Sequence, residues 1–225
     1  MLMLEQLFSL IAPHLCVKCQ KEGALICSDC ARMLPTAPLI CYRCSQSTDE
    51  QRICKTCVHL TLLDALYPAT IYDDTAKEVV RRLKYGRAQA AAHTMAQLMS
   101  HRLSQLSEFP PSTIVTYAPT ATTRVRIRGY DQASLLARSL AKTLGLTYRP
   151  LLVRTGQTRQ VGASREERKQ QIQQAFIPRT NMPRSITQVI LIDDVLTTGA
   201  TLEAAAAMLK RVGVERVTAV VFAVA

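Results

Sequence analysis

A buried strand that runs directly into two acids and a small-residue turn constrains the fold of this chain most. Residues 189–192 read Val-Ile-Leu-Ile, an apolar run with three β-branched members. Such a run is typical of a strand buried on both faces in a parallel α/β sheet. We predict that the strand ends at Asp193 and Asp194, that residues 197–201 form a turn, and that a helix runs from about 202 to 212. This order places polar groups at the carboxyl end of a parallel strand, where open α/β sheets bind ligands.

The turn between this strand and the helix has the chemistry of a phosphate site. Gly199 lets the backbone approach a ligand closely, and the free N–H groups at a helix N-terminus attract an anion. Three threonines add hydroxyl donors: Thr197, Thr198 and Thr201. Ionised Asp193 and Asp194 only accept hydrogen bonds, so they suit ribose hydroxyls or a hydrated Mg²⁺. The whole string predicts a ribose 5-phosphate site, whereas any one residue alone would equally fit solvated acids before an ordinary helix cap.

The stretch from Val189 to Leu202 resembles the phosphoribosyl pyrophosphate (PRPP) signature of type I phosphoribosyltransferases, without departure. The resemblance implies that Asp193 and Asp194 hold the ribose hydroxyls and are the catalytic acids. It implies that the next residues cradle the 5-phosphate: Thr197, Thr198, Gly199, Ala200 and Thr201. It also implies that Mg²⁺ binds together with PRPP.

All eight cysteines precede residue 58 and form four Cys-x-x-Cys pairs: Cys16/Cys19, Cys27/Cys30, Cys41/Cys44 and Cys54/Cys57. In a chain without an export signal this spacing indicates metal ligands rather than disulfides. We predict two structural Cys₄ zinc sites, because four thiolates leave the metal no open position. The pairs also form an internal repeat, each unit a turn followed by a pair that enters a short helix. Sequential pairing is favoured slightly over interleaved pairing, and an iron–sulfur cluster or redox dithiols are the alternatives.

Charge and hydropathy restrict the partners and the location. The net charge of +11 favours an anionic partner, either a polyphosphate substrate or nucleic acid. No apolar run reaches the roughly 18 residues of a membrane span. Residues 1–11 lack a basic region and a cleavage site, so we expect an amphipathic helix there and a cytoplasmic protein.

Strands and helices alternate from residue 66 onward, which predicts a three-layer α/β domain with a mainly parallel sheet. We therefore expect a Cys-rich module at 1–62 and a phosphoribosyltransferase-like domain at 63–225. The expected strands are 66–72, which contains a proline and suits an edge, then 112–117, 151–153 and 214–225. The expected helices are 76–83, 88–106 and 131–144.

Two basic segments are candidates for anion binding. Arg124, Arg126 and Arg128 follow an expected strand end and can chelate a pyrophosphate, although a solvated basic loop explains them as well. We name Arg124 and Arg128 as PRPP-binding residues. Residues 154–174 are long, polar and Arg/Gln-rich, which fits either a lid over an anionic substrate or a surface that faces nucleic acid.

Taken together, the chain resembles the ComF family of competence proteins. The shared features are the Leu-rich start before Pro13, the cysteine pairs, the PRPP signature and three segments: 83–85, 128–133 and 165–168. The resemblance implies a PRPP-type ligand and a role in DNA uptake during natural transformation, with single-stranded DNA or a helicase as partner. The alternative is an active phosphoribosyltransferase of nucleotide metabolism or salvage. One departure is Asp131, where the family usually has Asn: an acid would weaken a pyrophosphate contact but would cap a helix equally well.

Overall fold

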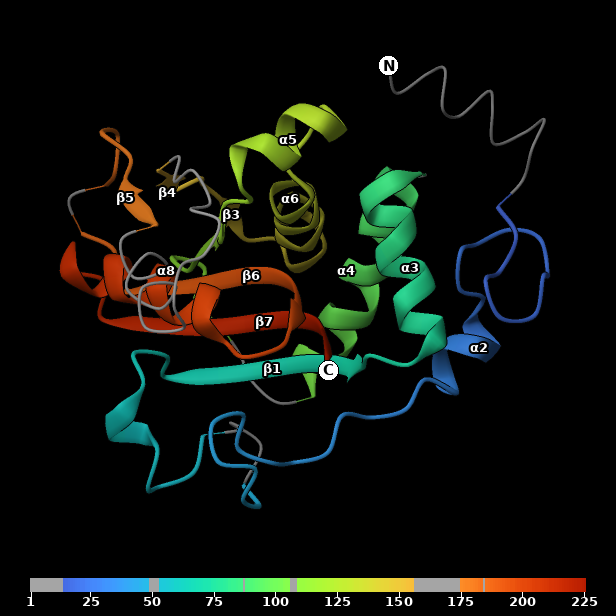
Figure 1. Ribbon diagram of the computed structural model, residues 1–225, viewed down its shortest axis with the longest axis horizontal. Coiled ribbons are helices and arrows are strands. Elements are labelled where there is room, and N and C mark those ends of the chain that lie inside the picture. The colour runs from blue at the N-terminus through green and yellow to red at the C-terminus, as the bar shows by residue number, and fades with distance from the viewer. Residues whose placement is uncertain (1–13, 49–52, 87, 106–108, 156–174, 184) are drawn as a thin grey trace, which may run out of the picture.

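The computed structural model describes residues 14–48, 53–86, 88–105, 109–155, 175–183 and 185–225. Its centre is a five-stranded sheet in the order β1-β7-β6-β2-β3, in which every neighbouring pair is parallel (Figure 1). The strands are β1 (Ala65–Ile71), β2 (Ile114–Tyr117), β3 (Thr147–Tyr148), β6 (Gln188–Leu196) and β7 (Arg216–Val224). The predicted α/β fold is therefore confirmed. β1, which contains Pro68, lies at an edge as expected.

The central strand β6 is buried on both faces, which confirms the prediction for residues 189–192. All four side chains are 0% exposed. Ile190 and Ile192 pack into one core, and Val189 and Leu191 pack into the other. Each such side chain contributes about 1.5–3 kcal/mol to stability when it is fully buried.

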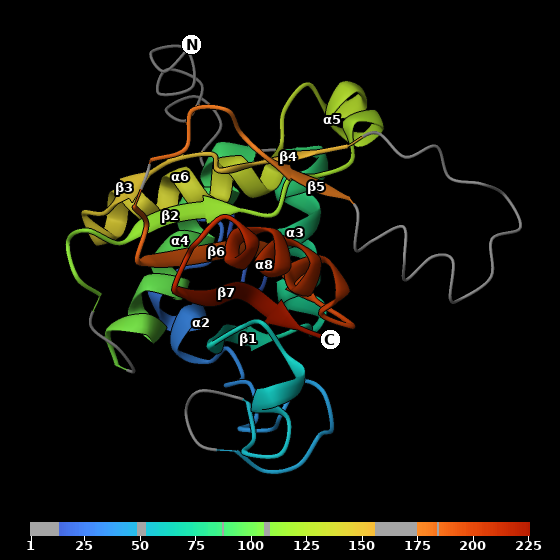
Figure 2. The same ribbon diagram turned by 90° about the vertical axis from the view of Figure 1, so that its left-hand side faces the viewer.

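Helices cover both faces of the sheet and form the expected outer layers (Figures 1 and 2). One core takes its helical residues from α3 (Asp74–Tyr85), α4 (Ala88–Ser104) and α6 (Gln132–Leu144). The other core takes them from α8 (Ala200–Arg211). An antiparallel pair, β4 (Leu152–Arg154) and β5 (Phe176–Pro178), also contributes to this second core. Because α8 follows β6 in the chain, its first residues lie near the carboxyl end of that strand.

Three local differences from the sequence prediction concern the site. β6 continues to Leu196, so the two acids lie inside the strand and not after it. α8 begins at Ala200, so the turn is shorter than predicted and two of its expected members start the helix. Residues 122–128 form a helix, α5 (Thr122–Arg128), where the sequence suggested a basic loop. None of its side chains is buried, so the sequence has no apolar periodicity from which this helix could be predicted.

The Cys-rich segment packs around the β1 edge of the sheet, and its two halves join different cores. Cys16 and Cys30 belong to the core that contains α3 and α4, whereas Cys41 and Cys57 belong to the core that contains α8. The repeat predicts that the second pair of each unit enters a short helix: α2 (Ser28–Arg32) begins inside the Cys27/Cys30 pair, and η1 (Val58–Leu60) begins directly after Cys57. The expected domain boundary at residue 62 falls between η1 and β1.

None of the helices that the structure describes is long and apolar enough to cross a membrane. Three predicted features lie outside the described residues: the amphipathic helix at 1–11, most of the polar stretch at 154–174, and the family segment at 165–168.

Candidate functional site

The two predicted acids lie near the carboxyl end of β6. Asp193 pairs in register with Val221 of β7. Asp194 is 7% exposed, and Asp193 is half-buried. The Asp194 N–H donates to Asp193 Oδ1 at 2.8 Å, and the Val195 N–H donates to Asp194 Oδ1 at 2.9 Å. Each carboxylate is thus oriented by the backbone amide that follows it.

Lys84 of α3 forms an ion pair with one of these two acids. Its Nζ lies 2.7 Å from Asp194 Oδ2. Apart from this ion pair, the buried Oδ2 atom has no hydrogen-bond partner among the described residues. A carboxylate oxygen that contacts one lysine ammonium can still accept from a ribose hydroxyl or from a water of hydrated Mg²⁺. Sequence reasoning included Lys84 in the segment 83–85 that resembles the family, but it did not assign this residue to the site.

Burial and the neighbouring charge of Asp194 raise the pKa of Asp193 well above its usual range, and Lys84 opposes this rise. Two carboxylates in one buried site do not both ionise easily without a cation. The electrostatics of the pair therefore favour binding of a positive ion or a hydroxyl donor.

The predicted phosphate ligands, residues 197–201 and called the phosphate loop below, follow β6 directly and include the first two residues of α8. Gly199 is the N-cap of α8 and has a left-handed φ of 75°, a conformation that favours glycine. Thr197 and Thr198 are exposed, whereas Gly199 is buried. The Ala200 N–H donates a weak hydrogen bond to Thr198 Oγ1 at 3.4 Å, and the Glu203 N–H donates to the Gly199 carbonyl at 2.9 Å. The structure thus brings the five predicted phosphate ligands together beside the acid pair.

Arg128, one of the two predicted PRPP arginines, contacts the segment that carries Lys84. It donates to Gln132 Oε1 at 2.6 Å and to the Tyr85 hydroxyl at 3.2 Å. Its guanidinium also lies 5.0 Å from the centre of the Tyr85 ring. Arg124 is exposed on the same helix, one turn earlier. Because positions four apart share one face of a helix, α5 presents the two arginines on the same side.

Asp131 acts as a helix cap and not as a free acid. Its Oδ1 accepts from the Ala133 N–H at 3.0 Å, and its two oxygens accept from the Thr120 hydroxyl at 2.9 Å and the Thr120 N–H at 3.0 Å. Capping is the role in which Asp serves as well as Asn. The departure from the family pattern therefore preserves the local structure.

A cleft of about 290 Å³ lies between α5, the end of β2 and the β4–β5 pair. Three arginines line it: Arg126, Arg154 and Arg179. Burial lowers the pKa of Arg154, and so does the charge of Arg124, while Asp193 opposes both. Sequence reasoning included Arg154 only as the first residue of the polar segment 154–174, and it missed Arg179, because nothing local shows that β4 and β5 end beside the cleft. Their position makes the cleft suitable for an anion.

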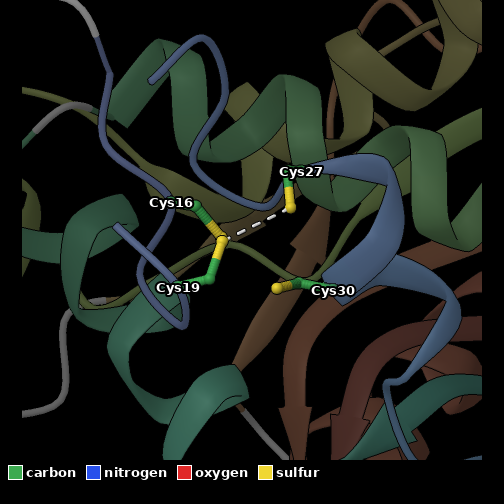
Figure 3. A group of neighbouring side chains, drawn as sticks. All are labelled: Cys16, Cys19, Cys27 and Cys30. Atoms are coloured by element: carbon green, nitrogen blue, oxygen red, sulfur yellow. Dashed lines mark hydrogen bonds between the residues drawn. The ribbon is translucent and has the colours of Figure 1, made fainter. Parts of the chain in front are cut away.

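The eight cysteines, all within the described residues, form two groups and no disulfide. The first cysteine cluster is Cys16, Cys19, Cys27 and Cys30; the second cysteine cluster is Cys41, Cys44, Cys54 and Cys57. The grouping is the sequential one. Figure 3 shows the four side chains of the first cluster pointing toward a common centre.

The geometry of both clusters fits tetrahedral zinc. The four sulfurs of each cluster lie within 4.8 Å of one another. The Cys19–Cys27 and Cys44–Cys54 sulfurs are 3.6 and 3.5 Å apart. Sulfurs that share a tetrahedral Zn²⁺ at about 2.3 Å lie roughly 3.8 Å from each other. The two clusters therefore have the donor set and the spacing of structural metal sites.

The pKa values of the thiols also favour a bound metal ion in each cluster. Burial raises the pKa of Cys16 and Cys41, but hydrogen bonds from neighbouring backbone amides outweigh it and lower both to about 6. Burial and then the neighbouring thiols raise the pKa of Cys30 and Cys57 to about 12. Four thiolates cannot coexist in such a space without a cation, and a bound metal removes that conflict.

Comparison with known proteins agrees with this architecture. The family model described as "Phosphoribosyl transferase domain" matches residues 131–224. A DNA utilization protein YhgH from Salmonella typhi is 27% identical over 215 residues, which cover 91% of this chain and 94% of that protein. Competence protein F from Haemophilus influenzae is 26% identical over 220 residues, with coverages of 90% and 93%.

Among solved structures, adenine phosphoribosyltransferase from Leishmania tarentolae matches with a TM-score of 0.34 and 15% identity, over 58% of this chain and 70% of that one. The informative comparisons are the near full-length sequence relatives and the matched domain. Over nearly its whole length the chain is similar to proteins named DNA utilization protein and competence protein, and it combines a phosphoribosyltransferase domain with two N-terminal Cys₄ clusters.

Proposed function

We propose that this protein binds PRPP with Mg²⁺ at the end of β6 and acts in the uptake and use of DNA in the cytoplasm. The observation that supports the binding proposal is the buried Oδ2 atom of Asp194, whose recognised partner among the described residues is the Lys84 ammonium, three positions before the phosphate loop begins at Thr197. The two hydroxyls of a ribose match the acid pair, and the 5-phosphate of the same ligand matches the phosphate loop that follows it.

Each part of the ligand has a counterpart in the chain. Asp193 and Asp194 accept from the ribose hydroxyls, and Lys84 keeps Asp194 in place through its ion pair. The phosphate loop and the N-terminus of α8 take the 5-phosphate. Arg124 and Arg128 take the pyrophosphate. The Mg²⁺ ion supplies charge neutralisation of the pyrophosphate oxygens. Zinc in the two cysteine clusters stabilises the fold around this site.

The binding proposal is tested by calorimetric titration of PRPP and Mg²⁺ into the full chain. We expect Asp193→Ala/Asp194→Ala to weaken binding by about 100-fold or more, because each hydrogen bond to a charged group contributes about 1.5–3 kcal/mol. The matched control is Asp29→Ala/Asp74→Ala, which removes the same charge from two exposed positions. Equal affinity in the two double variants would refute the assignment.

Turnover distinguishes this proposal from the alternative of an active phosphoribosyltransferase. The assay measures pyrophosphate release from PRPP with and without nucleic acid, bases or nucleosides as acceptors. Release that disappears in the Asp193→Ala/Asp194→Ala variant would establish the enzyme. Binding without release from any acceptor would establish a protein that uses PRPP as a ligand only.

For the DNA role we propose single-stranded DNA as the partner, since the relatives carry the names DNA utilization protein and competence protein, and the net charge is +11. Exposed Arg124 and Arg126 lie beside the site on α5. Fluorescence anisotropy at several salt concentrations should give weaker binding and a shallower salt dependence for Arg124→Ala/Arg126→Ala. Arg211→Ala/Arg216→Ala, which removes two exposed cations elsewhere, is the control. No binding by the wild type would favour a helicase partner instead.

A further inference from the structure

The second cysteine cluster is connected directly to the helix that ends the phosphate loop. Glu203, in the first turn of α8, accepts from three donors of the Cys-rich segment. These donors are the Tyr42 hydroxyl, Arg43 Nη1 at 2.9 Å and the Leu62 N–H at 3.1 Å. Tyr42 and Arg43 occupy the two positions between Cys41 and Cys44. A turn that the metal would fix therefore holds the beginning of α8.

The ring of Tyr42 also lies against the phosphate loop itself. A Cβ atom placed on Gly199 would come within 2.9 Å of Tyr42 Cε2 and 3.1 Å of Tyr42 Cδ2. Only glycine leaves room for the ring at this position. The Tyr42 hydroxyl is held at 2.6 Å by the hydroxyl of Thr61, which in turn accepts from the Leu63 N–H at 3.1 Å. The ring is thus fixed at its far end while its edge touches the N-cap of α8.

The second cysteine cluster and the residues that flank the phosphate loop also pack into the same hydrophobic core. Cys41 is 0% exposed and Cys57 is 5% exposed. Both belong to the core that contains Leu196 and Leu202, the residues on either side of the phosphate loop. The Arg43–Glu203 ion pair is partly exposed and would contribute little by itself. Its convergence with the tyrosine hydroxyl, the backbone amide and the ring contact is what defines the position of the loop.

The first cysteine cluster has a different environment. Its buried members pack with residues of α3 and α4 on the other face of the sheet. Among the described residues, no hydrogen bond joins the first cysteine cluster to the phosphate loop. The two metal sites are therefore expected to differ in their effect on a 5-phosphate ligand.

We propose that the second cysteine cluster positions the phosphate loop through Tyr42 and Glu203, so that metal in this cluster and a 5-phosphate in the loop strengthen each other's binding. Tyr42 and Glu203 are positioning residues, since they act on the ligand through Gly199 and the first turn of α8. The inference rests on the proposed PRPP site. Reciprocity is a thermodynamic requirement: if metal tightens phosphate binding, phosphate tightens metal binding by the same factor.

The test uses the full zinc-loaded chain and ribose 5-phosphate, which engages the loop without needing Mg²⁺. Tyr42→Phe removes the hydroxyl but keeps the ring, and Glu203→Gln keeps the shape but removes the charge. We expect each to bind ribose 5-phosphate about 5- to 20-fold more weakly, a typical size for coupling between sites. Glu78→Gln makes the same change on α3, where Glu78 pairs with Arg81 and Arg82, and should leave the affinity unchanged.

A second measurement follows zinc transfer to a coloured chelator. Saturating ribose 5-phosphate should slow the release of one zinc equivalent in the wild type and leave the other unchanged. The effect should disappear in Tyr42→Phe. A contact that only supports folding would lower the unfolding temperature of the variants without altering either the phosphate affinity or the ligand dependence of zinc release.

The outcomes separate the two proposals. Wild type that binds neither ribose 5-phosphate nor PRPP would overturn the proposed function and this inference together. Wild type that binds, with both variants within twofold of it and zinc release indifferent to ligand, would overturn the inference and leave the PRPP site intact.

Discussion

Gly199→Ala should be far more destabilising than an ordinary glycine substitution, because two separate effects meet at this position. The backbone has a φ of 75°, where a side chain is strained. The new methyl group would also lie 2.9 Å from a ring carbon of Tyr42, closer than carbon atoms approach each other.

The two effects can be estimated separately. The left-handed backbone costs a residue with a Cβ about 1–2 kcal/mol. Forcing a methyl group into an occupied space costs a further 1–3 kcal/mol or so, typical of overpacked sites. Gly199→Ala should therefore lower the free energy of unfolding by about 2–5 kcal/mol, a large part of the stability of a typical domain.

Urea unfolding of four proteins isolates the clash: wild type, Gly199→Ala, Tyr42→Ala and the double variant. With the ring removed, Gly199→Ala should retain only the backbone term, so the cycle should give a coupling energy of about 1–3 kcal/mol. The control is Gly129→Ala. Gly129 has nearly the same backbone, with a φ of 77°, and nothing lies within 4 Å of a Cβ placed there.

Two results would refute this reasoning. If Gly199→Ala and Gly129→Ala lower stability equally, the ring does not contact the loop. If Tyr42→Ala leaves the effect of Gly199→Ala unchanged, the strain comes from another neighbour, and the proposed link between the second cluster and the phosphate loop loses its structural basis.

Three further predictions follow from the site. Metal analysis of the purified protein should give about two zinc equivalents, and Cys30→Ser and Cys57→Ser should each lose one; an iron-containing sample would contradict this. Burial raises the pKa of Asp193, so the folded state loses stability as pH rises from the usual aspartate range through the raised pKa. Urea unfolding at increasing pH should therefore show Asp193→Asn gaining stability relative to wild type, and parallel curves would contradict this. Asp131→Ala should lower the free energy of unfolding by about 1–2 kcal/mol, because it removes the N-cap of α6. Asp131→Asn should cost less, because one acceptor oxygen remains. Equal losses of stability in the two variants would show that Asp131 does not act as a cap.

Local patterns in the sequence were sufficient for the elements around the site. The apolar run at 189–192, the acid pair and the small-residue turn predicted a buried parallel strand, its polar end and the helix that follows. These features depend on neighbouring residues, since backbone propensity, capping and side-chain alternation act over a few positions. The eight cysteines predicted two Cys₄ clusters for the same reason, because Cys-x-x-Cys spacing already places two sulfurs near one ion.

The same local reasoning failed where no periodic signal exists. α5 was expected as a basic loop, because none of its side chains is buried and its arginines alternate with apolar residues that face solvent. β5 was not predicted, because its three residues form a strand only by pairing with β4. The length of β6 was underestimated, because the ladder with β7 continues past the acids to Leu196.

Only the tertiary structure decided which distant residues meet. Lys84 reaches Asp194 because α3 packs into the same core as the inner side chains of β6. Tyr42 reaches Gly199 because the Cys-rich segment passes around the edge at β1. Strand order sets both contacts, and strand order results from the packing of whole layers rather than from any short segment. The sequence alone therefore determined which residue types stand in the PRPP-like signature and how the cysteines pair, while the fold determined that the second cysteine cluster lies against the proposed phosphate loop.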